Sequence, residues 1–550
     1  MWWKNRIAYQ IYPRSFQDSN GDGIGDIPGI ISRLDEIKEL GVGIIWLSPV
    51  YKSPDADNGY DISDYCDINS KFGTMADMEK LFAEAAKRGI RIIMDLVINH
   101  TSDEHEWFQK SRDPASPYRD YYIWRPGKNG KLPNNWTGFF MDKAWEYDEK
   151  SGEYYLRLFD KKQPDLNYKN PKVIEEVKKI LTFWLEKGAS GFRCDVINII
   201  YKTSLEDGKK SLSVQGIEHY KSQEGNHKIL RELRRDVLDK YDCFTVGETV
   251  FVDLKEAKLL SDESRKELNM LFYFDHLEVD RRIAQFIPKK FRARKLLEVI
   301  TKWQQGLEWN AIYFENHDQP RIVSHFGAAE KDSKYWKRSA KMLALFELTL
   351  RGTPFIYQGQ EIGMTNFDFE NLNELNDAMS HGLDKLMKKL CIPGFLRWNW
   401  IKASSRDNAR TPMQWDESEY EGFSKAKPWL GVNGNYKKIN YASQKKDPDS
   451  ILNFYKAMAA VRKNSDCLIY GEFIPIYADN RLIIYQRRLK NKESQKDETY
   501  TIALNFSSRI VKIPGKFLSL FSGIPVISAS GQKEFNGSLL PWDGVLVSNT

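Results

Sequence analysis

One short stretch of the sequence decides the fold: Gly191-Phe192-Arg193-Cys194-Asp195-Val196-Ile197-Asn198. Its apolar run carries an arginine, Arg193, and two residues later a carboxylate, Asp195. In a strand, residues i and i+2 lie on the same face, so these two side chains should be neighbours. A guanidinium beside a carboxylate favours the ionised carboxylate and lowers its pKa. An ionised carboxylate at the end of a strand can act as a nucleophile, although a purely structural Arg–Asp pair is the alternative.

Three other strand-like runs also end in polar residues, and their last residues are Asn99 and His100, Glu248, and His317 and Asp318. Near-continuous apolar strands that alternate with amphipathic helices indicate a parallel sheet covered by helices. The predicted strands are Ile7–Tyr12, Gly43–Val50, Ile90–Ile98, Gly191–Val196, Phe244–Gly247, Met270–Phe274, Ala311–Phe314 and Thr353–Tyr357. The predicted helices between and after them are Pro28–Leu40, Asp77–Arg88, Lys172–Lys187, His227–Lys240, Lys290–Gln305, Ser333–Arg351 and Ser450–Arg462. Eight such strands predict an α/β fold, a (β/α)8 TIM barrel.

Two segments interrupt this alternation and one follows it. We expect residues 1–102 and 172–466 to form the barrel, and residues 103–171, rich in Trp, Tyr, Asp, Pro and Gly, to form a small domain inserted after the third strand. A second long excursion, Gly359–Pro448, follows the eighth strand. Residues 467–550 alternate in short runs and predict a C-terminal antiparallel β domain. Its expected strands are Phe473–Tyr477, Leu482–Arg488, Thr499–Asn505 and Leu540–Val547.

Composition narrows the class of protein. The 82 basic and 76 acidic residues are well mixed, so no basic block points to nucleic acid or to an anionic membrane. The five cysteines include no CxxC pair, which favours reduced thiols in a cytoplasm. No stretch approaches the roughly 20 apolar residues of a membrane span, and the first residues lack the apolar segment of a signal peptide. We therefore expect a cytoplasmic protein with a small, importable substrate.

The polar strand ends carry a resemblance. The motifs DLVINH (95–100), QPDLN (163–167), GFRCDVIN (191–198), VGE (246–248) and ENHDQPR (315–321) resemble the conserved regions of the α-amylase family of glycoside hydrolases. The resemblance runs from Trp2 to the C-terminus and is nearest to the oligo-1,6-glucosidase, dextran glucosidase and trehalose-6-phosphate hydrolase group. It implies a retaining, exo-acting α-glucosidase that hydrolyses α-1,6 bonds of isomalto-oligosaccharides, with no organic cofactor, as a monomer or weak oligomer.

Other functions remain open at this point. Related enzymes are an α-1,4-glucosidase (maltase), a trehalose-6-phosphate hydrolase, and a sucrose-active or transglucosylating relative. A non-catalytic scaffold, like the amino-acid transporter heavy chains that share this barrel, is disfavoured because the carboxylates are intact. The chain has no RLDRD-like segment after Asp318, which argues against a sucrose isomerase. It also carries Thr249-Val250-Phe251 where many relatives have methionine or tryptophan and then glycine or proline, so the acceptor side is expected to differ.

The resemblance assigns roles to individual residues. Glycoside cleavage needs a nucleophile and a general acid, which it places at Asp195 and Glu248. The apolar strand before Glu248 would favour the protonated form that an acid needs. Asp318 would be the third carboxylate, which holds sugar hydroxyls. The remaining implied substrate-binding residues are Asp57, Tyr60, His100, Arg193, Val196, His317 and Arg410.

Two of these assignments carry structural expectations. Asp57 is expected to pair with Arg410 across the far end of the pocket, and Tyr60 to stack on the sugar. Val196 matches a position that is valine in α-1,6-acting members and usually alanine or threonine in α-1,4-acting ones. It should point away from Asp195 along the strand, but can border the leaving-group site if the chain turns there.

An acidic loop near the N-terminus predicts a metal site. Oxygen-bearing side chains alternate with glycines from Asp18 to Asp26, as in the first half of an EF-hand loop, but the glutamate at position twelve is missing. The resemblance implies structural Ca2+ held by the side chains of Asp18, Asn20, Asp22 and Asp26 and by the carbonyl of Ile24. The alternative is a metal-free turn.

Overall fold

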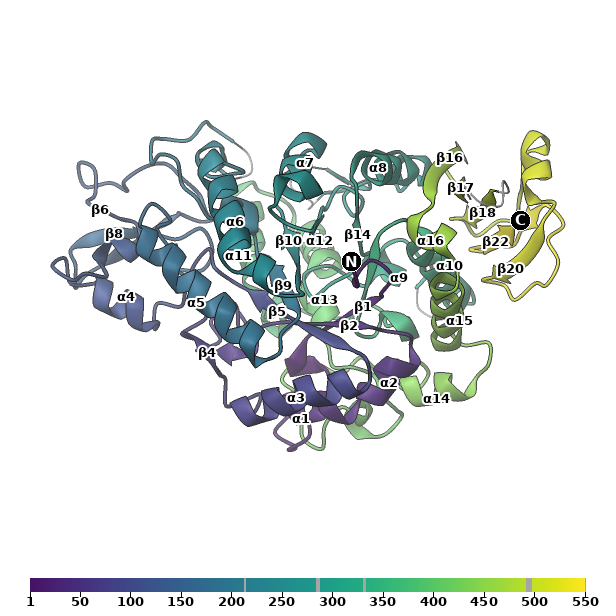
Figure 1. Ribbon diagram of the computed structural model, residues 1–550, viewed down its shortest axis with the longest axis horizontal. Coiled ribbons are helices and arrows are strands. Elements are labelled where there is room, and N and C mark those ends of the chain that lie inside the picture. Colours follow the sequence, from purple (N-terminus) through teal and green to yellow (C-terminus); the bar gives the residue numbers. More distant parts are fainter. Residues whose placement is uncertain (212–213, 283–286, 330–332, 491–496, 550) are drawn as a thin grey trace.

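The computed structural model describes the whole chain except residues 212–213, 283–286, 330–332, 491–496 and 550. Eight parallel strands form the central sheet in the order β11-β10-β9-β5-β2-β1-β15-β14. The first and last strands of this order, β11 and β14, are linked just beyond their ends. The hydroxyl of Tyr313, after β14, donates a 2.9 Å hydrogen bond to the carbonyl of Tyr273, after β11. The strands are β1 (Ala8–Ile11), β2 (Ile44–Leu47), β5 (Arg91–Leu96), β9 (Gly191–Cys194), β10 (Phe244–Glu248), β11 (Met270–Phe272), β14 (Ala311–Ile312) and β15 (Thr353–Tyr357). The predicted α/β barrel is confirmed (Figure 1).

Helices cover the outside of this sheet because one face of each is apolar. They include α1 (Ile27–Ser32), α2 (Leu34–Glu39), α3 (Met75–Lys87), α5 (Pro171–Lys187), α6 (Glu224–Asp236), α7 (Leu254–Ser261), α8 (Ala293–Gly306), α10 (Trp336–Thr349) and α15 (Ile451–Lys463). Local signals set their ends: Asn170 caps α5, whose first residue is proline, and Gly188 ends it with a φ of 115°. The helix expected over Pro28–Leu40 is two helices, because the backbone leaves helical geometry at Arg33 (φ −110°, ψ 8°).

The segment between β5 and β9 forms the inserted domain at the left of Figure 1. It holds α4 (Glu106–Ser111) and a three-stranded sheet of β6 (Trp124–Arg125), β8 (Glu153–Leu156) and β7 (Trp145–Asp148). Trp136 and Trp145 fill a core of its own, which Val196 and Ile199 join from the barrel. The inserted domain is thus packed against the strand end that carries the predicted nucleophile.

The chain after the barrel folds into an antiparallel sheet at the right of Figure 1, as expected. Its order is β16 (Glu472–Ala478), β17 (Leu482–Leu489), β18 (Glu498–Asn505), β22 (Gly544–Ser548) and β20 (Ile524–Ser528). The last of these strands has no counterpart among the predictions. Arg487 anchors the sheet to the barrel, because its Nη1 donates to the carbonyls of Thr349 at 2.5 Å and Leu468 at 2.8 Å.

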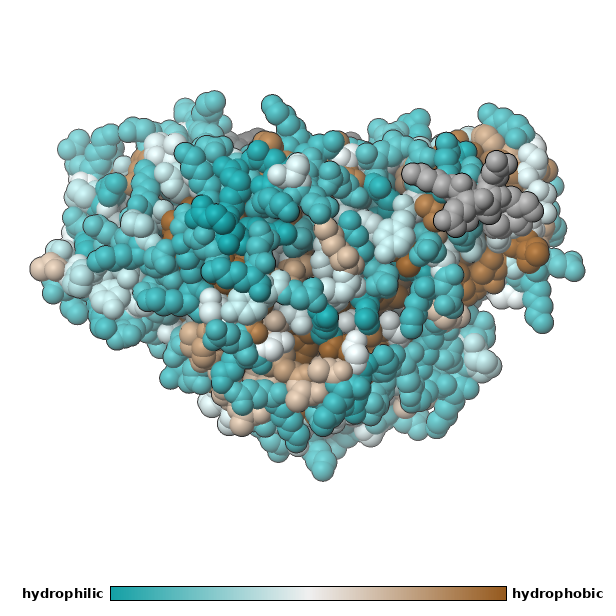
Figure 2. Space-filling model, in the orientation of Figure 1, coloured by the Kyte–Doolittle hydropathy of each residue, from teal (hydrophilic) through white to brown (hydrophobic). Residues whose placement is uncertain are grey.

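The excursion after β15 contains several helices joined by irregular segments and returns to the carboxyl ends of the barrel strands. It contains α11 (Ala378–Lys389), α12 (Gly394–Ser404), α13 (Asp407–Arg410) and α14 (Tyr441–Lys446). The surface seen in Figure 2 is largely hydrophilic, with small scattered apolar areas. Within the part of the chain that the structure describes, no helix has the length and apolar character needed to cross a membrane.

Candidate active site

The predicted site residues meet in one cavity of about 480 Å³ beside the carboxyl ends of the barrel strands. Those that line it are Asp57, Tyr60, His100, Asp195, Val196, Glu248 and Asp318. Arg193, His317 and Arg410 lie just behind this lining and contact it through hydrogen bonds. In a parallel barrel such strand ends converge on one face, which is why residues from different strands meet here.

Arg193 is the centre of the site. Its Nη1 donates to Asp195 Oδ1 at 2.6 Å and to Asp95 Oδ1 at 2.8 Å, and its Nη2 donates to Glu248. The side chain is buried, and Trp46 lies 5.0 Å from it on one side. One guanidinium therefore holds the predicted nucleophile and the predicted acid next to each other. A planar, permanently charged fork is suited to such bridging.

Arg193 lowers the pKa of Asp195, as predicted, but the net shift of that pKa is upward, against the expected ionised state. Burial raises the pKa of Asp195 well above its usual range, and Arg193 opposes this without cancelling it. The negative charge of Glu248 and a hydrogen bond between the two carboxyl groups raise it further. The sequence could not reveal that Arg193 divides its charge among three carboxylates.

The backbone turns sharply after Asp195, the predicted nucleophile. Strand β9 ends at Cys194, and Asp195 still donates its backbone N–H to the carbonyl of Leu96 at 3.0 Å. Val196 then has a φ of +34°, which is unusual for a β-branched residue and marks local strain. This turn brings Val196 to the wall of the cavity, which was the outcome expected if the chain turned after Asp195 instead of continuing as a strand.

His317 and Tyr60 form a hydrogen-bonded pair beside the cavity. Gln10 donates to His317 Nδ1 at 2.8 Å, which assigns the proton to Nε2, and this N–H donates to the Tyr60 hydroxyl at 2.7 Å. The two rings are stacked with centroids 5.3 Å apart. Burial lowers the pKa of His317 to about 3 and that of His100 to about 4. Both imidazoles are therefore neutral near pH 7.

A second group of charges closes the far end of the cavity. Arg410 Nη2 donates to Asp318 Oδ1 at 2.6 Å, and Arg406 Nη1 lies 3.5 Å from the same oxygen. Burial alone would raise the pKa of Asp318, but His317, Arg406 and Arg410 together hold it well below its usual range. Asp318 is therefore an ionised group that cannot donate a proton.

The expected pair between Asp57 and Arg410 was wrong. Asp57 Oδ1 instead lies 3.8 Å from Arg406, because Arg410 is turned toward Asp318 and also donates from Nε to the carbonyl of His317 at 3.0 Å. Burial raises the pKa of Asp57 to about 6, against the influence of Arg406 and Arg410. The cavity end is still closed by charge, but through a different arginine.

Three polar residues of this network were not assigned from the sequence. Arg406 joins Asp57, Asp318 and Asp377, and it stands in the same RDNAR run as Arg410. Gln163 Nε2 donates to Asp57 Oδ2 at 3.1 Å and lies 3.1 Å from His100 Nε2. Asp95 binds Arg193, Trp46 and Tyr60, and burial raises its pKa to about 6. Gln163 and Asp95 lie in motifs that carried the resemblance, so their positions were the available signal.

The predicted calcium loop closes through its own hydrogen bonds. Asp18 Oδ1 accepts the backbone N–H groups of Asn20 and Gly21, and its Oδ2 accepts those of Gly23 and the hydroxyl of Ser424. Asp22 and Asp26 likewise accept from Ile24 and from Ser19. Among the residues described, no group of three or more His, Cys, Asp or Glu side chains is placed to hold a metal. These hydrogen bonds hold the loop closed, and Ca2+ binding remains a prediction for measurement.

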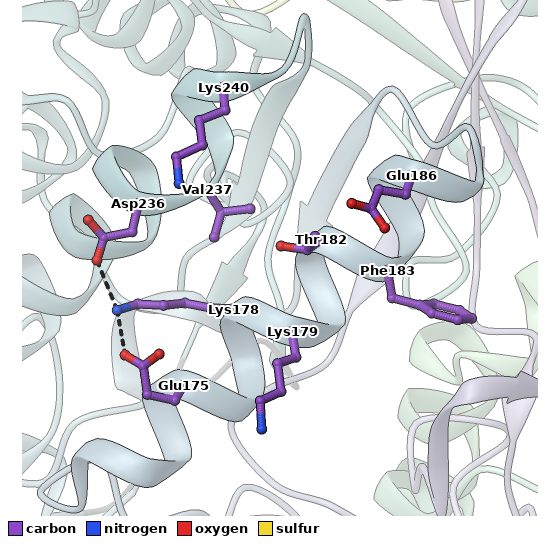
Figure 3. Close-up of a pocket in the computed structure, with 9 residues that line it drawn as sticks. All are labelled: Glu175, Lys178, Lys179, Thr182, Phe183, Glu186, Asp236, Val237 and Lys240. Carbon is purple, nitrogen blue, oxygen red and sulfur yellow. Dashed lines mark hydrogen bonds and ion pairs between the residues drawn. The ribbon is translucent and has the colours of Figure 1, made fainter.

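A second cavity of about 520 Å³ lies on the outside of the barrel (Figure 3). It lies between α5 and the end of α6, where Lys178 pairs with Glu175 on its own helix at 2.7 Å and reaches across to Asp236 at 2.9 Å. These ion pairs neutralise Lys178, and none of the catalytic candidates lines this cavity. The chemistry therefore belongs to the cavity at the strand ends.

Comparison with known proteins agrees with this geometry. Residues 10–471 match the family model described as alpha amylase, catalytic domain. An oligo-1,6-glucosidase from Parageobacillus thermoglucosidasius is 48% identical over 99% of this chain and 98% of its own length. A glucan 1,6-alpha-glucosidase from Streptococcus pneumoniae is 42% identical over 99% of both chains.

Solved structures are similar along the whole chain. The trehalulose synthase of Pseudomonas mesoacidophila MX-45 superposes with a TM-score of 0.93 at 39% identity, covering 100% of this chain and 99% of the other. A trehalose-6-phosphate hydrolase mutant from Bacillus licheniformis superposes with a TM-score of 0.92 at 40% identity, with coverage of 100% and 99%. With the family model matching most of its length, this chain belongs to the α-amylase family of glycoside hydrolases.

Proposed function

We propose that this protein is a retaining, exo-acting α-glucosidase that hydrolyses the α-1,6 bonds of isomalto-oligosaccharides. The observation that carries the proposal is the bridge formed by Arg193 between Asp195 and Glu248 inside a cavity whose far end is closed by charge. A double displacement at a glycosidic bond uses two neighbouring carboxyl groups, one as the nucleophile and one as the general acid. Because the far end of the cavity is closed, only the terminal sugar of an oligosaccharide would enter it, which favours exo-acting cleavage.

The chemical steps follow from these positions. Asp195 attacks the anomeric carbon while Glu248 gives its proton to the departing glycosidic oxygen, which breaks the bond and leaves a glucosyl ester on Asp195. A water molecule then gives a proton back to Glu248 and attacks the same carbon, which releases Asp195. Two inversions return the α configuration. Neutral His100 can contact sugar hydroxyls from the cavity wall, His317 orients the Tyr60 hydroxyl, and ionised Asp318 can accept hydrogen bonds from sugar hydroxyls.

Two observations support the α-1,6 linkage. Val196 borders the cavity directly after the nucleophile, and its branched, stiff side chain would crowd an acceptor sugar held close to the wall. The additional rotatable bond of an α-1,6 linkage lets the acceptor swing clear. The relatives named above as acting on 1,6 bonds match the full length of the chain.

A substrate panel tests the assignment. We expect kcat/KM to be highest for isomaltose and panose, lower for maltose, and negligible for trehalose-6-phosphate. Sucrose should be neither isomerised nor cleaved at a comparable rate. Higher kcat/KM for maltose, or conversion of sucrose to an isomer, would move the chain to one of those related activities.

We also propose a cytoplasmic location and a monomer or weak oligomer. All five cysteines are free thiols, which suits a reducing compartment. Fractionation of the source cells and sedimentation at micromolar concentration would test both points.

A further inference from the structure

An entirely apolar turn joins helices α11 and α12 at the surface of the protein. Residues 390–396 read Leu-Cys-Ile-Pro-Gly-Phe-Leu, and the two helices pack against each other as a hairpin. Leu390 is 63% exposed and Phe395 is 68% exposed. A run of apolar residues that faces water is unfavourable unless it serves binding.

Backbone hydrogen bonds fix the shape of this turn. The N–H of Ile392 donates to the carbonyl of Met387 at 3.0 Å. The N–H of Cys391 donates to the carbonyl of Lys388, also at 3.0 Å, and the two bonds together form the Schellman motif that ends α11. Pro393, whose ring fixes its own φ, then directly precedes α12. The apolar turn is therefore an ordered surface before any partner arrives.

Packing within the chain does not account for the apolar side chains at the turn. The hairpin has a core of its own, to which α11 contributes Leu383 and Met387 and α12 contributes Ile401. Among the residues that the structure describes, neither Leu390 nor Phe395 belongs to this core or to any other buried apolar cluster. The stability of the fold therefore does not explain why these two side chains are large and apolar.

Basic residues surround the turn. The hairpin, residues 378–404, holds five basic residues and one acidic residue, Asp384. Asp384 pairs with Lys388 at 2.6 Å and with Arg397 at 3.0 Å. Lys385 and Lys389 are exposed, and neither forms an ion pair within the described part of the chain. The lysines do not form a basic block in the sequence, and only the hairpin gathers them around the apolar turn.

We propose that this turn docks the protein reversibly on an anionic lipid membrane, with Leu390 and Phe395 inserted among the headgroups and Lys385 and Lys389 facing the lipid phosphates. The boundary between headgroups and acyl chains accepts apolar side chains from a projecting tip, whereas a folded protein needs a matching hollow. Lysines beside the tip complement the negative charge of the headgroups. The proposal concerns where the protein resides and goes beyond the glucosidase function.

The hairpin also separates this docking tip from the catalytic cavity. Met379, near the start of α11, and Ser404, at the end of α12, line the cavity. An α-helix rises 1.5 Å per residue, so the tip lies roughly 15 Å from these two residues. The tip does not line the cavity, and changes there should leave the turnover of isomaltose in solution unaltered.

Co-sedimentation with lipid vesicles tests the proposal on the whole chain. We expect binding to phosphatidylglycerol vesicles at millimolar lipid and low salt, little binding to phosphatidylcholine vesicles, and weaker binding at high salt because salt screens the charges. L390A and F395A should each lower the partition coefficient about 5- to 30-fold, since roughly two-thirds of each side chain is free to be buried. K385Q and K389Q should each lower it about 5-fold.

Control variants change the same kinds of side chain elsewhere. I524A removes an apolar side chain of β20 that is 77% exposed, and K446Q removes an exposed lysine outside the hairpin, so neither should alter binding. The melting temperature and the kcat on isomaltose should match wild type in every variant.

Three results would overturn the proposal. The first is no binding to phosphatidylglycerol vesicles, and the second is binding that L390A, F395A, K385Q and K389Q all leave undiminished. The third is a dimer that forms without lipid and that F395A abolishes in sedimentation velocity, because the turn would then be an interface with a second copy of the chain.

Discussion

Arg410 Nη2 lies 2.6 Å from Asp318 Oδ1, and this contact argues against Asp318 as the acid among the three predicted catalytic carboxylates. Burial would raise the pKa of Asp318, but His317 and the two arginines Arg406 and Arg410 hold it well below the usual range. A carboxylate ionised at every working pH can bind hydroxyls but cannot protonate a leaving group. Proton donation is therefore left to the pair of Asp195 and Glu248 that Arg193 bridges.

The roles of that pair can be separated by the leaving group. Asp195→Asn removes the nucleophile and should lower kcat by several orders of magnitude on every substrate. Glu248→Gln should lower kcat/KM, which reports the formation of the glucosyl ester, by several orders of magnitude on isomaltose but much less on 2,4-dinitrophenyl α-glucoside, whose leaving group needs no proton. Circular dichroism would check that both variants fold. Equal losses on the two substrates in Glu248→Gln would show that Glu248 is not the proton donor.

The preference for α-1,6 over α-1,4 bonds should depend on the size of the side chain at Val196. We expect Val196→Ala to raise kcat/KM for maltose relative to isomaltose by about 5- to 100-fold, because removing methyl groups widens the wall beside the acceptor sugar and shifts discrimination by roughly 1–3 kcal/mol. The inverse comparison, Val196→Ile, should leave the preference for isomaltose intact. If neither variant changes the ratio, the side chain serves only packing in the core shared with the inserted domain.

The acidic loop should affect stability more than turnover. If it binds Ca2+, Asp22→Ala and a chelator should each lower the melting temperature while leaving kcat at low temperature nearly unchanged. Asp64→Ala, on β4 (Asp64–Ile68) and outside the loop, is a control. A melting temperature that a chelator does not move, together with no metal in the purified protein, would identify the loop as the hydrogen-bonded turn that its contacts already form.

Stability should fall with rising pH because of Glu361. Burial raises the pKa of this carboxyl to about 7, with the Tyr9 hydroxyl donating to Oε1 at 2.7 Å and opposing the shift. Between the ordinary carboxyl pKa and 7, the folded state holds a proton that the unfolded chain releases, so the free energy of unfolding decreases as pH rises. Glu361→Gln should match wild type near pH 4 and be more stable by about 3 kcal/mol at pH 8. Chemical unfolding at both pH values measures this, with exposed Glu417→Gln as control. A gain that is the same at both pH values would contradict it.

The barrel was predictable because its evidence is local. Each strand is a continuous apolar run, and features such as Gly188 and Asn170 mark where α5 ends and begins. Convergence of Asp195, Glu248 and Asp318 followed from strand-end positions in that fold. Pairings between individual side chains were harder to predict from the sequence. Arg406 and Arg410 are only four residues apart, and the course of α13 decides which of them lies near Asp57. Charge sharing at Arg193 and the strained turns at Val196 and Phe251 depend on tertiary contacts and left no signature in the sequence.

The central claim is tested most directly by proton NMR of an equimolar mixture of isomaltose and maltose during early hydrolysis. We expect the α-1,6 anomeric signal to disappear first and the released glucose to show an excess of the α anomer before mutarotation, as retention at a double displacement requires. Faster loss of the α-1,4 signal, or an initial excess of β-glucose, would contradict the proposed enzyme.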